Sequence, residues 1–318
     1  MANTTRRLIS IIVPCYNEAA IIDGFFSKLQ AIADANHDNS YEFVYVNDGS
    51  RDDSLAYLQQ LATTDTRLKL VSFTRNFGKE MATTAGIRAA SGDAIIILDA
   101  DGQHPIELIP EFLAKWQAGA QVVIGVRTNS YQTAFKRLTS KLFYKLFNSH
   151  SDTHLIPGST DFRLIDKAVQ QEFITLSEHS RMTRALIDWL GFRKDYVYFE
   201  MAERIGGTAS YDIGKLIGLA LDSFVSLSLR PLYMLAYAGF VSLLLSVILA
   251  LFSASEMLIG DPLGLRITGT AYLVLLILFL IGMILISQGV LALYVSHIHT
   301  ETKARPLYIV DREASRGI

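Results

Sequence analysis

Several features that would place this chain in a common class are absent from it. Cys15 is the only cysteine, which excludes an internal disulfide and a thiolate metal cluster, so we expect it to be a small buried apolar residue. The charges nearly balance, with 29 Lys and Arg against 31 Asp and Glu, and this excludes the overall basic field of a nucleic-acid-binding protein. No P-loop is present, because Gly78 and Lys79 are followed by Glu80 and not by Ser or Thr. The first apolar run soon meets Pro14, which indicates a strand and a turn, not a signal peptide.

Apolar residues, in contrast, are abundant. They make up 50% of the 318 residues, and the mean hydropathy is +0.28. This is too hydrophobic for a purely soluble protein of this length, so part of the chain is expected to contact lipid.

The first part of the chain alternates short apolar strands with helix-length segments. Near-continuous apolar strands that alternate with helices predict an α/β fold with a mostly parallel sheet covered by helices on both faces. Ligands of such sheets bind at the carboxyl ends of the strands. The predicted strands are 8–13, 41–46, 68–73, 94–98 and 121–126, and the predicted helices are 19–33, 54–62, 79–89 and 106–117.

The second part of the chain contains two long stretches without charge, Leu232–Phe252 and Thr270–Tyr294. Each is long enough to cross a hydrocarbon core of about 30 Å as a helix, and the alternative is a buried helical hairpin. The positive-inside rule places both ends, and with them the first domain, in the cytoplasm. The predicted protein is therefore a multi-pass protein of the cytoplasmic membrane. The charges used are Lys215, Arg230, Lys303, Arg305 and Arg312 outside the pair, against Glu256, Asp261 and Arg266 between its members.

Two further segments have amphipathic patterns. In residues 134–147 a basic face alternates with an apolar face, which is typical of a helix lying on an anionic membrane surface. Residues 213–225 also have helical apolar spacing, and packing against a protein core remains the alternative for both segments. The predicted organisation is a catalytic domain over 1–210 with an interfacial helix near 133–148, a juxtamembrane helix over 211–230, a two-helix membrane hairpin over 231–296 and a cytoplasmic tail over 297–318.

The fourth predicted strand ends in the sequence DADGQ. Asp99 and Asp101 are two residues apart, so their carboxylates can point the same way and would repel each other without a cation between them. Oxygen ligands of this kind select Mg²⁺ or Mn²⁺, and Gln103 can add a neutral oxygen. The sequence therefore predicts a divalent metal site at the carboxyl edge of the sheet.

The ends of the first two strands carry groups suited to a nucleoside. Asp48 can accept a hydrogen bond from a base or a ribose hydroxyl, and Glu18 beside Tyr16 can do similar work. The alternative is that Asn47, Asp48 and Ser50 only form a turn and cap the next helix.

Taken in order, these motifs resemble those of the family 2 glycosyltransferases that load sugars onto polyprenyl phosphate, the group of dolichol-phosphate mannose synthase and the bactoprenol glucosyltransferases. The resemblance covers essentially the whole chain. It implies a GT-A fold that transfers a hexose, with inversion, from a nucleotide sugar to a lipid phosphate at the cytoplasmic membrane face. The motifs are PCYNE, NDGSRD, RNFGKE, DADGQHP, TDFRLID (160–166) and Arg-x-x-Gly-x-x-Ser-Tyr (204–211), followed by the two apolar stretches.

The resemblance also implies roles for individual residues. Asp161 matches a candidate catalytic carboxylate and acts with Asp99 and Asp101, and it serves either as a base or as an orienting group. Where the family often has Ser-Lys-Tyr, this chain has Ala209, Ser210 and Tyr211, which leaves more of the phosphate binding in that loop to Arg204. The remaining implied roles are nucleoside contacts for Pro14, Tyr16, Glu18 and Asp48, metal ligation by Asp99, Asp101 and Gln103, and lipid-phosphate contacts for Arg127, Arg137, Ser140 and Arg204.

The expected partners are a nucleotide sugar, a polyprenyl (undecaprenyl) phosphate acceptor and membrane lipid, with Mg²⁺ or Mn²⁺ as cofactor. The resemblance favours UDP-glucose as donor and a homotetramer as assembly, while UDP-GlcNAc or another sugar stays open. A processive polysaccharide synthase would need a Gln-x-x-Arg-Trp motif and more spans, which the sequence lacks. A non-catalytic membrane scaffold would not need the intact Asp99, Asp101 and Gln103.

Overall fold

The computed structural model describes residues 6–128, 158–179, 181–200 and 269–318, together with the helical positions 237, 239–242, 244, 245, 247, 248 and 251. Residues 1–210 and 305–318 form one compact unit, and residues 211–304 form another. The predicted interfacial helix near 133–148 and the juxtamembrane helix over 211–230 lie outside the described residues.

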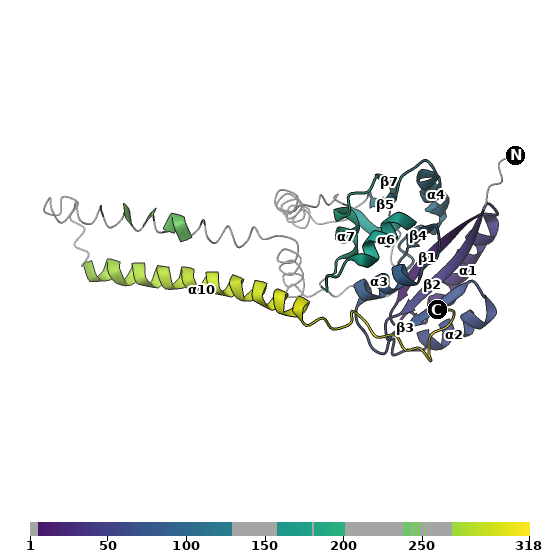
Figure 1. The fold of residues 1–318 in the computed structure, drawn as a ribbon, viewed down its shortest axis with the longest axis horizontal. Coiled ribbons are helices and arrows are strands. Elements are labelled where there is room, and N and C mark those ends of the chain that lie inside the picture. Colours follow the sequence, from purple (N-terminus) through teal and green to yellow (C-terminus); the bar gives the residue numbers. More distant parts are fainter. Residues whose placement is uncertain are drawn as a thin grey trace. The chain divides into compact units, whose positions relative to one another are not determined.

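The first unit is built on a mixed sheet whose described strands number seven, in the order β3-β2-β1-β4-β6-β5-β7 (Figure 1). All neighbours pair in parallel except β6, which runs antiparallel to both β4 and β5. The predicted α/β class with a mostly parallel sheet is therefore confirmed. The strands are β1 (Arg7–Cys15), β2 (Asn39–Asn47), β3 (Leu68–Ser72), β4 (Ala94–Ile97), β5 (Val122–Arg127), β6 (Ser159–Asp166) and β7 (Lys194–Phe199).

Helices cover both faces of this sheet. One apolar cluster joins one face to α1, α2 and α4, and a second cluster joins the opposite face to α3, α6 and α7. The central strands are apolar on both faces for this reason, and Cys15 is buried in the first cluster as predicted. The helices are α1 (Ile22–Ala35), α2 (Ser54–Thr64), α3 (Lys79–Ala89), a 3₁₀ turn (Ile106–Leu108) running into α4 (Ile109–Gln117), α6 (Lys167–Thr175) and α7 (Thr183–Trp189).

Local sequence explains several of these elements. Ile22, Phe25, Phe26 and Leu29 recur at helical spacing and form the buried face of α1. Gly86 lets α3 approach β1 closely, since a Cβ atom there would lie 2.3 Å from Cγ2 of Ile12.

The boundary between β6 and α6 is set by one side chain. The carboxylate of Asp166 accepts a hydrogen bond from the amide of Ala168 at 2.8 Å and so caps α6. The same carboxylate accepts from the indole N–H of Trp116 at 2.7 Å, which ties this boundary to α4.

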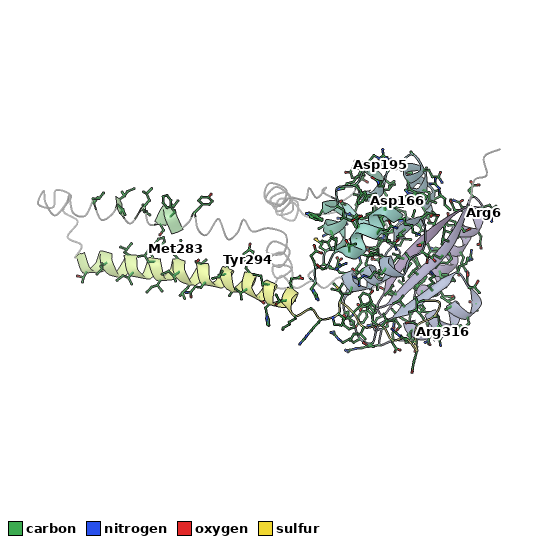
Figure 2. The ribbon with its side chains drawn as sticks, viewed as in Figure 1. Arg6, Asp166, Asp195, Met283, Tyr294 and Arg316 are labelled. Carbon is green, nitrogen blue, oxygen red and sulfur yellow. The ribbon has the colours of Figure 1, made fainter. Side chains whose placement is uncertain are left out.

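The second unit contains α10 (Gly269–Thr302), a helix that includes the second predicted span. Within the part of the chain that the structure describes, one helix is long and apolar enough to cross a membrane: the stretch Phe279–Thr302 has a mean hydropathy of 2.0, and 6% of it is buried. The consecutive residues Ile284, Leu285 and Ile286 are 55%, 62% and 60% exposed, so the helix is apolar around its circumference (Figure 2). The first predicted span lies largely outside the described residues, so a second such helix is not confirmed.

Residues 305–318 were expected to form part of a cytoplasmic tail, but they pack on the first unit beside the edge strand β3 (Figure 1). Leu70 pairs with Arg316, and Phe73 pairs with Val310, both in antiparallel bridges. The sequence of this segment, which includes the apolar run 307–310, did not predict a contact with a strand about 240 positions earlier, because pairing over such a separation leaves no local pattern.

A buried polar network lies at the end of the sheet where β1 and β4 begin. Glu42 is 6% exposed, and its carboxylate accepts hydrogen bonds from the Ser10 hydroxyl at 2.5 Å and the Ser91 amide at 2.6 Å, with Lys69 Nζ at 2.8 Å. Burial alone would raise the pKa of Glu42, but the bonds from Lys69, Ser10 and Ser91 outweigh it and hold the pKa below its ordinary value of 4.5. The ionised network therefore stabilises the fold.

We predict that Glu42→Gln lowers the free energy of unfolding at pH 7 by about 1–3 kcal/mol, because the charge facing Lys69 is lost in a buried site. A carboxylate with a lowered folded pKa stabilises above its unfolded pKa and stops doing so as the pH falls. The acid-induced loss of stability should therefore be smaller in Glu42→Gln than in the wild type. Thermal unfolding in detergent between pH 3 and pH 8 measures both effects. Glu172→Gln, at an exposed position of α6, is the matched control and should change neither.

Candidate active site

The loops that follow the parallel strands meet at one edge of the sheet. The residues after β1, β2 and β4 are 16–18, 48–52 and 98–103, and they include most of the predicted site. Because β6 runs antiparallel, its first residues reach this same edge, which brings Asp161 to the end of β4. The sequence motifs PCYNE, NDGSRD, DADGQ and TDFRLID therefore share one end of the molecule.

The first two of these loops brace each other. The amide of Asn17 donates to the Ser50 hydroxyl at 3.0 Å, and the Asn17 side-chain oxygen accepts from the Arg51 amide at 2.8 Å. The amide of Glu18 donates to the Ser54 hydroxyl at 2.9 Å. Asn17 has a φ of 55°, a left-handed conformation that asparagine tolerates better than most residues. Of the predicted nucleoside contacts here, Pro14 is buried in β1, while Tyr16 is 39% exposed beside the partly buried Glu18.

Asp48 lies deeper than a surface contact residue would. It is 3% exposed, and its carboxylate accepts hydrogen bonds from the amides of Phe77 at 2.7 Å and Gly78 at 2.9 Å and from the Asn76 side chain at 3.0 Å. Burial raises the pKa of Asp48, and the two amide bonds only partly offset it. The carboxylate thus holds residues 76–78 of the segment 74–78. We call this segment the donor-site loop, after the sugar donor that the sequence predicts at this edge of the sheet.

Gly49 allows the backbone of the donor-site loop to pack closely against the turn that follows β2. Its φ is +64°, and a Cβ atom at this position would lie 2.3 Å from the backbone carbonyl carbon of Arg75. The turn reading of NDGSRD is also supported, because the Asn47 side-chain oxygen accepts from the Ser50 amide at 3.2 Å.

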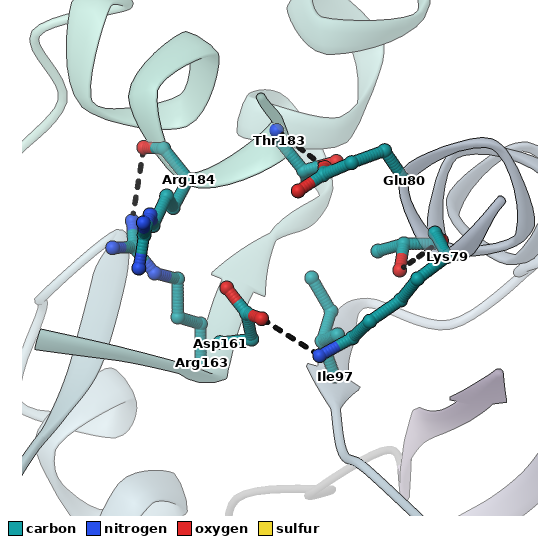
Figure 3. A pocket seen from close by; sticks show the side chains of 8 residues that line it. Lys79, Glu80, Ile97, Asp161, Arg163, Thr183 and Arg184 are labelled. Carbon is teal, nitrogen blue, oxygen red and sulfur yellow. Dashed lines mark hydrogen bonds and ion pairs between the residues drawn. The ribbon is translucent and has the colours of Figure 1, made fainter. Parts of the chain in front are cut away.

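The donor-site loop delivers Lys79, the first residue of α3, to the centre of the site. Its Nζ lies 2.6 Å from Oδ1 of Asp99 and 2.8 Å from Oδ2 of Asp161. Figure 3 shows the contact with Asp161. Desolvation opposes the charged form of the lysine, but the two carboxylates outweigh it and raise the pKa of Lys79. Desolvation alone would likewise raise the pKa of Asp161, and the charge of Lys79 lowers it instead. One ammonium group therefore holds together two carboxylates from different strands.

The buried side chain of His104 holds the backbone of Asp99 in place. It is 5% exposed, its ring stacks on Phe162 with centroids 5.3 Å apart, and its Nδ1 accepts from the Asp99 amide at 3.2 Å. Burial lowers the pKa of His104, although Asp99 and Asp101 oppose the shift. The neutral ring supports the turn at Asp99 through this hydrogen bond.

The predicted metal ligands lie together after β4. Among the described residues no set of three or more His, Cys, Asp and Glu side chains is arranged to hold a metal ion. The oxygen ligands present are the carboxylates of Asp99 and Asp101 and the side-chain amide oxygen of Gln103. The backbone N–H of Gln103 donates a hydrogen bond to Asp101 Oδ1 at 3.1 Å. This all-oxygen set on partly exposed side chains fits the chemistry of a hard divalent cation that keeps several other ligands.

A small pocket, open to solvent, extends from this cluster toward α7 (Figure 3). Glu80 accepts from the Thr183 amide at 2.7 Å, and burial raises the pKa of Glu80. Arg163, which is 1% exposed, pairs with Asp188 at 3.3 Å and donates to the Arg184 carbonyl at 3.1 Å. The residues that line the pocket are Lys79, Glu80, Thr83, Ile97, Asp161, Arg163, Thr183 and Arg184.

Sequence reasoning missed most of these lining residues. Lys79 served only to exclude a P-loop, although its position after glycine at a helix start could have marked it. Arg163 was visible in TDFRLID, two residues after Asp161 and hence on the same side of the strand. Nothing in the sequence near Thr183 and Arg184 pointed to the site.

The predicted lipid-phosphate residues are less completely placed. Arg127 lies at the end of β5, where it is partly buried and its amide donates to the Gly158 carbonyl at 2.9 Å. Arg137, Ser140 and Arg204 lie outside the described residues.

Comparison with known proteins gives a consistent result. Residues 10–174 match the family described as glycosyl transferase family 2. YkcC of Bacillus subtilis, an uncharacterized glycosyltransferase, is 37% identical over 311 residues, covering 95% of this chain and 93% of the relative. The SfII prophage-derived bactoprenol glucosyl transferase of Shigella flexneri is also 37% identical over 311 residues, covering 97% of this chain and 99% of the relative.

The described architecture is also similar to that of solved structures. Mannosyl-3-phosphoglycerate synthase from Rubrobacter xylanophilus matches with a TM-score of 0.50 and 15% sequence identity, covering 83% of this chain and 78% of that chain. At this identity the likeness concerns the fold alone.

We predict that Lys79→Met lowers the melting temperature at pH 7 in metal-free buffer, because Asp161 loses its counter-charge. Asp161 has a pKa held below its ordinary value of 3.8, so the ion pair stabilises above that pH and is lost as the pH falls. The difference in melting temperature between wild type and Lys79→Met should therefore shrink toward pH 3. Lys115→Met, which breaks the exposed Lys115–Asp195 pair of 3.1 Å, is the matched control and should have the smaller effect. A constant difference at all pH values would show that the lysine does not stabilise through its charge.

Proposed function

The chain belongs to glycosyl transferase family 2, and from this premise we propose that it transfers a hexose from a nucleotide sugar, UDP-glucose, to the phosphate of an undecaprenyl or similar polyprenyl phosphate. The observation that carries the proposal is the 37% identity, over nearly the full length of both chains, to a bactoprenol glucosyl transferase. The choice of UDP-glucose over UDP-GlcNAc or another sugar follows the name of that relative.

The residues at the carboxyl edge suit the donor half of such a reaction. Tyr16 and Glu18 lie in the loop after β1, which is hydrogen-bonded to the loop after β2, and a nucleoside can bind at this surface. Asp48 acts by holding the donor-site loop, since the three hydrogen bonds that its carboxylate accepts all come from that loop. Asp99, Asp101 and Gln103 are the residues that would hold Mg²⁺ or Mn²⁺. A divalent cation there would neutralise the charge that develops on the departing nucleoside diphosphate.

Lys79 adds a fixed positive charge to this site. Its ammonium group already contacts Asp99 and Asp161, so it needs no reorganisation when a diphosphate arrives beside them. A lysine held by two carboxylates keeps its proton, because both neighbours favour the charged form. Its role is therefore to compensate charge and not to transfer a proton.

The acceptor supplies its own nucleophile. A phosphate monoester has a second pKa near about 6, so its oxygen is largely dianionic at neutral pH and needs no strong base. This oxygen forms a bond to C1 of the sugar on the face opposite the leaving group. The bond from C1 to the diphosphate oxygen breaks with its electron pair, which inverts the configuration. Because Lys79 keeps the pKa of Asp161 low, Asp161 is a weak base, and we assign it an orienting role.

A membrane location is part of the proposal. The lipid acceptor is insoluble in water, and α10 exposes apolar side chains all round its axis. Together with the flanking charges of the sequence, this supports a catalytic domain on the cytoplasmic face of a membrane. A second crossing by Leu232–Phe252 rests on the sequence alone. Arg127, Arg137, Ser140 and Arg204 are proposed to bind the lipid phosphate.

We predict that the purified protein in detergent or nanodiscs consumes UDP-glucose only when undecaprenyl phosphate and Mn²⁺ or Mg²⁺ are both present. Mass spectrometry of the lipid should show one hexose added through a monophosphate. Asp99→Asn and Asp101→Asn should each lower the rate by on the order of 100-fold or more, because charge compensation at the leaving group is lost. Asp195→Asn, a carboxylate change at the start of β7, is the control. Hydrolysis without lipid, or a polymeric product, would contradict the proposed reaction.

The role of Asp161 has a separate test. With Asp161→Asn we expect kcat to fall by roughly 10- to 100-fold through lost orientation, while the acid limb of the rate against pH stays near about 6, where the acceptor phosphate titrates. Initial rates between pH 5 and pH 8 measure both quantities. An acid limb that disappears in the variant would assign proton transfer to Asp161.

A further inference from the structure

The C-terminal segment 305–318 completes the outer edge of β3. Leu70 exchanges two backbone hydrogen bonds with Arg316, each of 2.9 Å. The Ser72 carbonyl accepts from the Asp311 amide at 2.8 Å, and the Ser72 amide donates to the Ser315 hydroxyl at 3.0 Å. These hydrogen bonds pair the outward-facing backbone groups of Leu70 and Ser72 in the edge strand. Stabilisation of that edge is sufficient to explain why residues 311–316 pack there.

Contacts of the same segment continue past the end of the strand, onto the donor-site loop. The amide of Thr74, the first residue of that loop, donates to the Ile309 carbonyl at 3.1 Å. The ring of Tyr308 stacks on Phe73 with centroids 4.8 Å apart and an interplanar angle of 18°. The Thr74–Ile309 bond belongs to the Phe73–Val310 bridge and continues the edge pairing beyond Ser72, the last residue of β3, whereas that pairing does not require the stack of Tyr308 on Phe73.

A row of three aromatic rings, Tyr308, Phe73 and Phe77, connects the C-terminal segment with the donor-site loop. Phe73 meets Phe77 edge to face with centroids 5.6 Å apart, and the Phe77 amide is one of the groups bound by Asp48. On its other side, Tyr308 lies near the guanidinium of Arg88, 6.0 Å from the ring centroid, and Arg88 belongs to α3. Tyr308 therefore contacts both the residue before the loop and the helix after it.

We propose that residues 308–309 form a positioning element of the donor site, which holds the donor-site loop and thereby sets Lys79 against Asp99 and Asp161. Two anchors fix the loop between β3 and α3: the carboxylate of Asp48 from within the site, and the stacked ring of Tyr308 from outside it. The catalytic consequence of this proposal rests on the proposed function, while the positioning itself does not.

The test compares three variants of the full-length protein in detergent by amide hydrogen exchange read by mass spectrometry. Tyr308→Ala removes the stacked ring, Tyr308→Phe keeps it, and Ser315→Ala weakens the same segment where it meets β3. We expect Tyr308→Ala to speed exchange of the Thr74, Phe77 and Gly78 amides by about three- to tenfold, the factor that corresponds to one aromatic pair. Tyr308→Phe should leave these amides within about twofold of the wild type. Ser315→Ala should speed exchange at Leu70 and Ser72 but not at Phe77 and Gly78.

Two results would overturn the inference. Unchanged exchange at Phe77 and Gly78 in Tyr308→Ala would show that the ring does not hold the loop. If Ser315→Ala speeds exchange at Phe77 and Gly78 as much as Tyr308→Ala does, the segment stabilises the domain in general and does not position the loop. If Tyr308→Ala exchanges rapidly at all its amides, the variant is not stably folded. Tyr308→Leu then replaces it, because leucine keeps an apolar side chain but removes the aromatic stack, and the same two criteria apply.

A kinetic measurement adds the link to function. In Tyr308→Ala we expect the KM for UDP-glucose to rise about three- to tenfold while the KM for undecaprenyl phosphate stays unchanged, because the contacted loop lies on the donor side. A rise in both KM values, or in neither, would contradict this. Absence of transfer by the wild type would refute the proposed function and leave the exchange result to decide the positioning role.

Discussion

Two carboxylates, Asp99 and Asp161, lie at one edge of the sheet because a single ammonium group, that of Lys79, contacts both at 2.6 and 2.8 Å. Like charges so close to each other would otherwise force one of them to take up a proton or move away. The rest of the site depends on this constraint. Lys79 can bridge the pair only if α3 starts at the right place, and that start is set by the hydrogen bonds of Asp48 to Phe77 and Gly78. A buried carboxylate that does not itself line the pocket thus controls the charge balance of the pocket.

The candidate active site and the polar network that stabilises the sheet lie at opposite ends of the strands. The network of Ser10, Glu42, Lys69 and Ser91 lies where β1 and β4 begin, whereas the carboxylate cluster lies beyond the end of β4. A parallel sheet allows this division, because all parallel strands present their carboxyl ends at one edge and the antiparallel β6 adds its first residues there. Loops at the carboxyl edge can then carry unfavourable like-charge contacts while the opposite edge contributes stability.

The α/β class and the first five strands were predictable, since apolar runs and helical spacing are local properties of the sequence. The predicted run 94–98 corresponds to β4 at Ala94–Ile97, and the predicted helix 79–89 has the same bounds as α3. The contacts of Lys79 could not be predicted in this way, because they join positions 79, 99 and 161, which are adjacent only after the sheet has formed. The same reason hid the second role of Asp48, which looked like a ligand contact or a turn residue and serves as the anchor of a loop 28 to 30 positions away. Metal ligation by Asp99, Asp101 and Gln103 stays a prediction based on donor chemistry.

The return of residues 305–318 to β3 also has a consequence for biosynthesis. A ribosome makes the strand long before it makes the segment that covers it, and the apolar helix Gly269–Thr302 emerges in between. The backbone groups of Leu70 and Ser72 at the outer edge of β3 therefore stay unpaired until residues 305–318 have been made. During that interval the nascent domain exposes an unpaired edge strand that can pair with other chains.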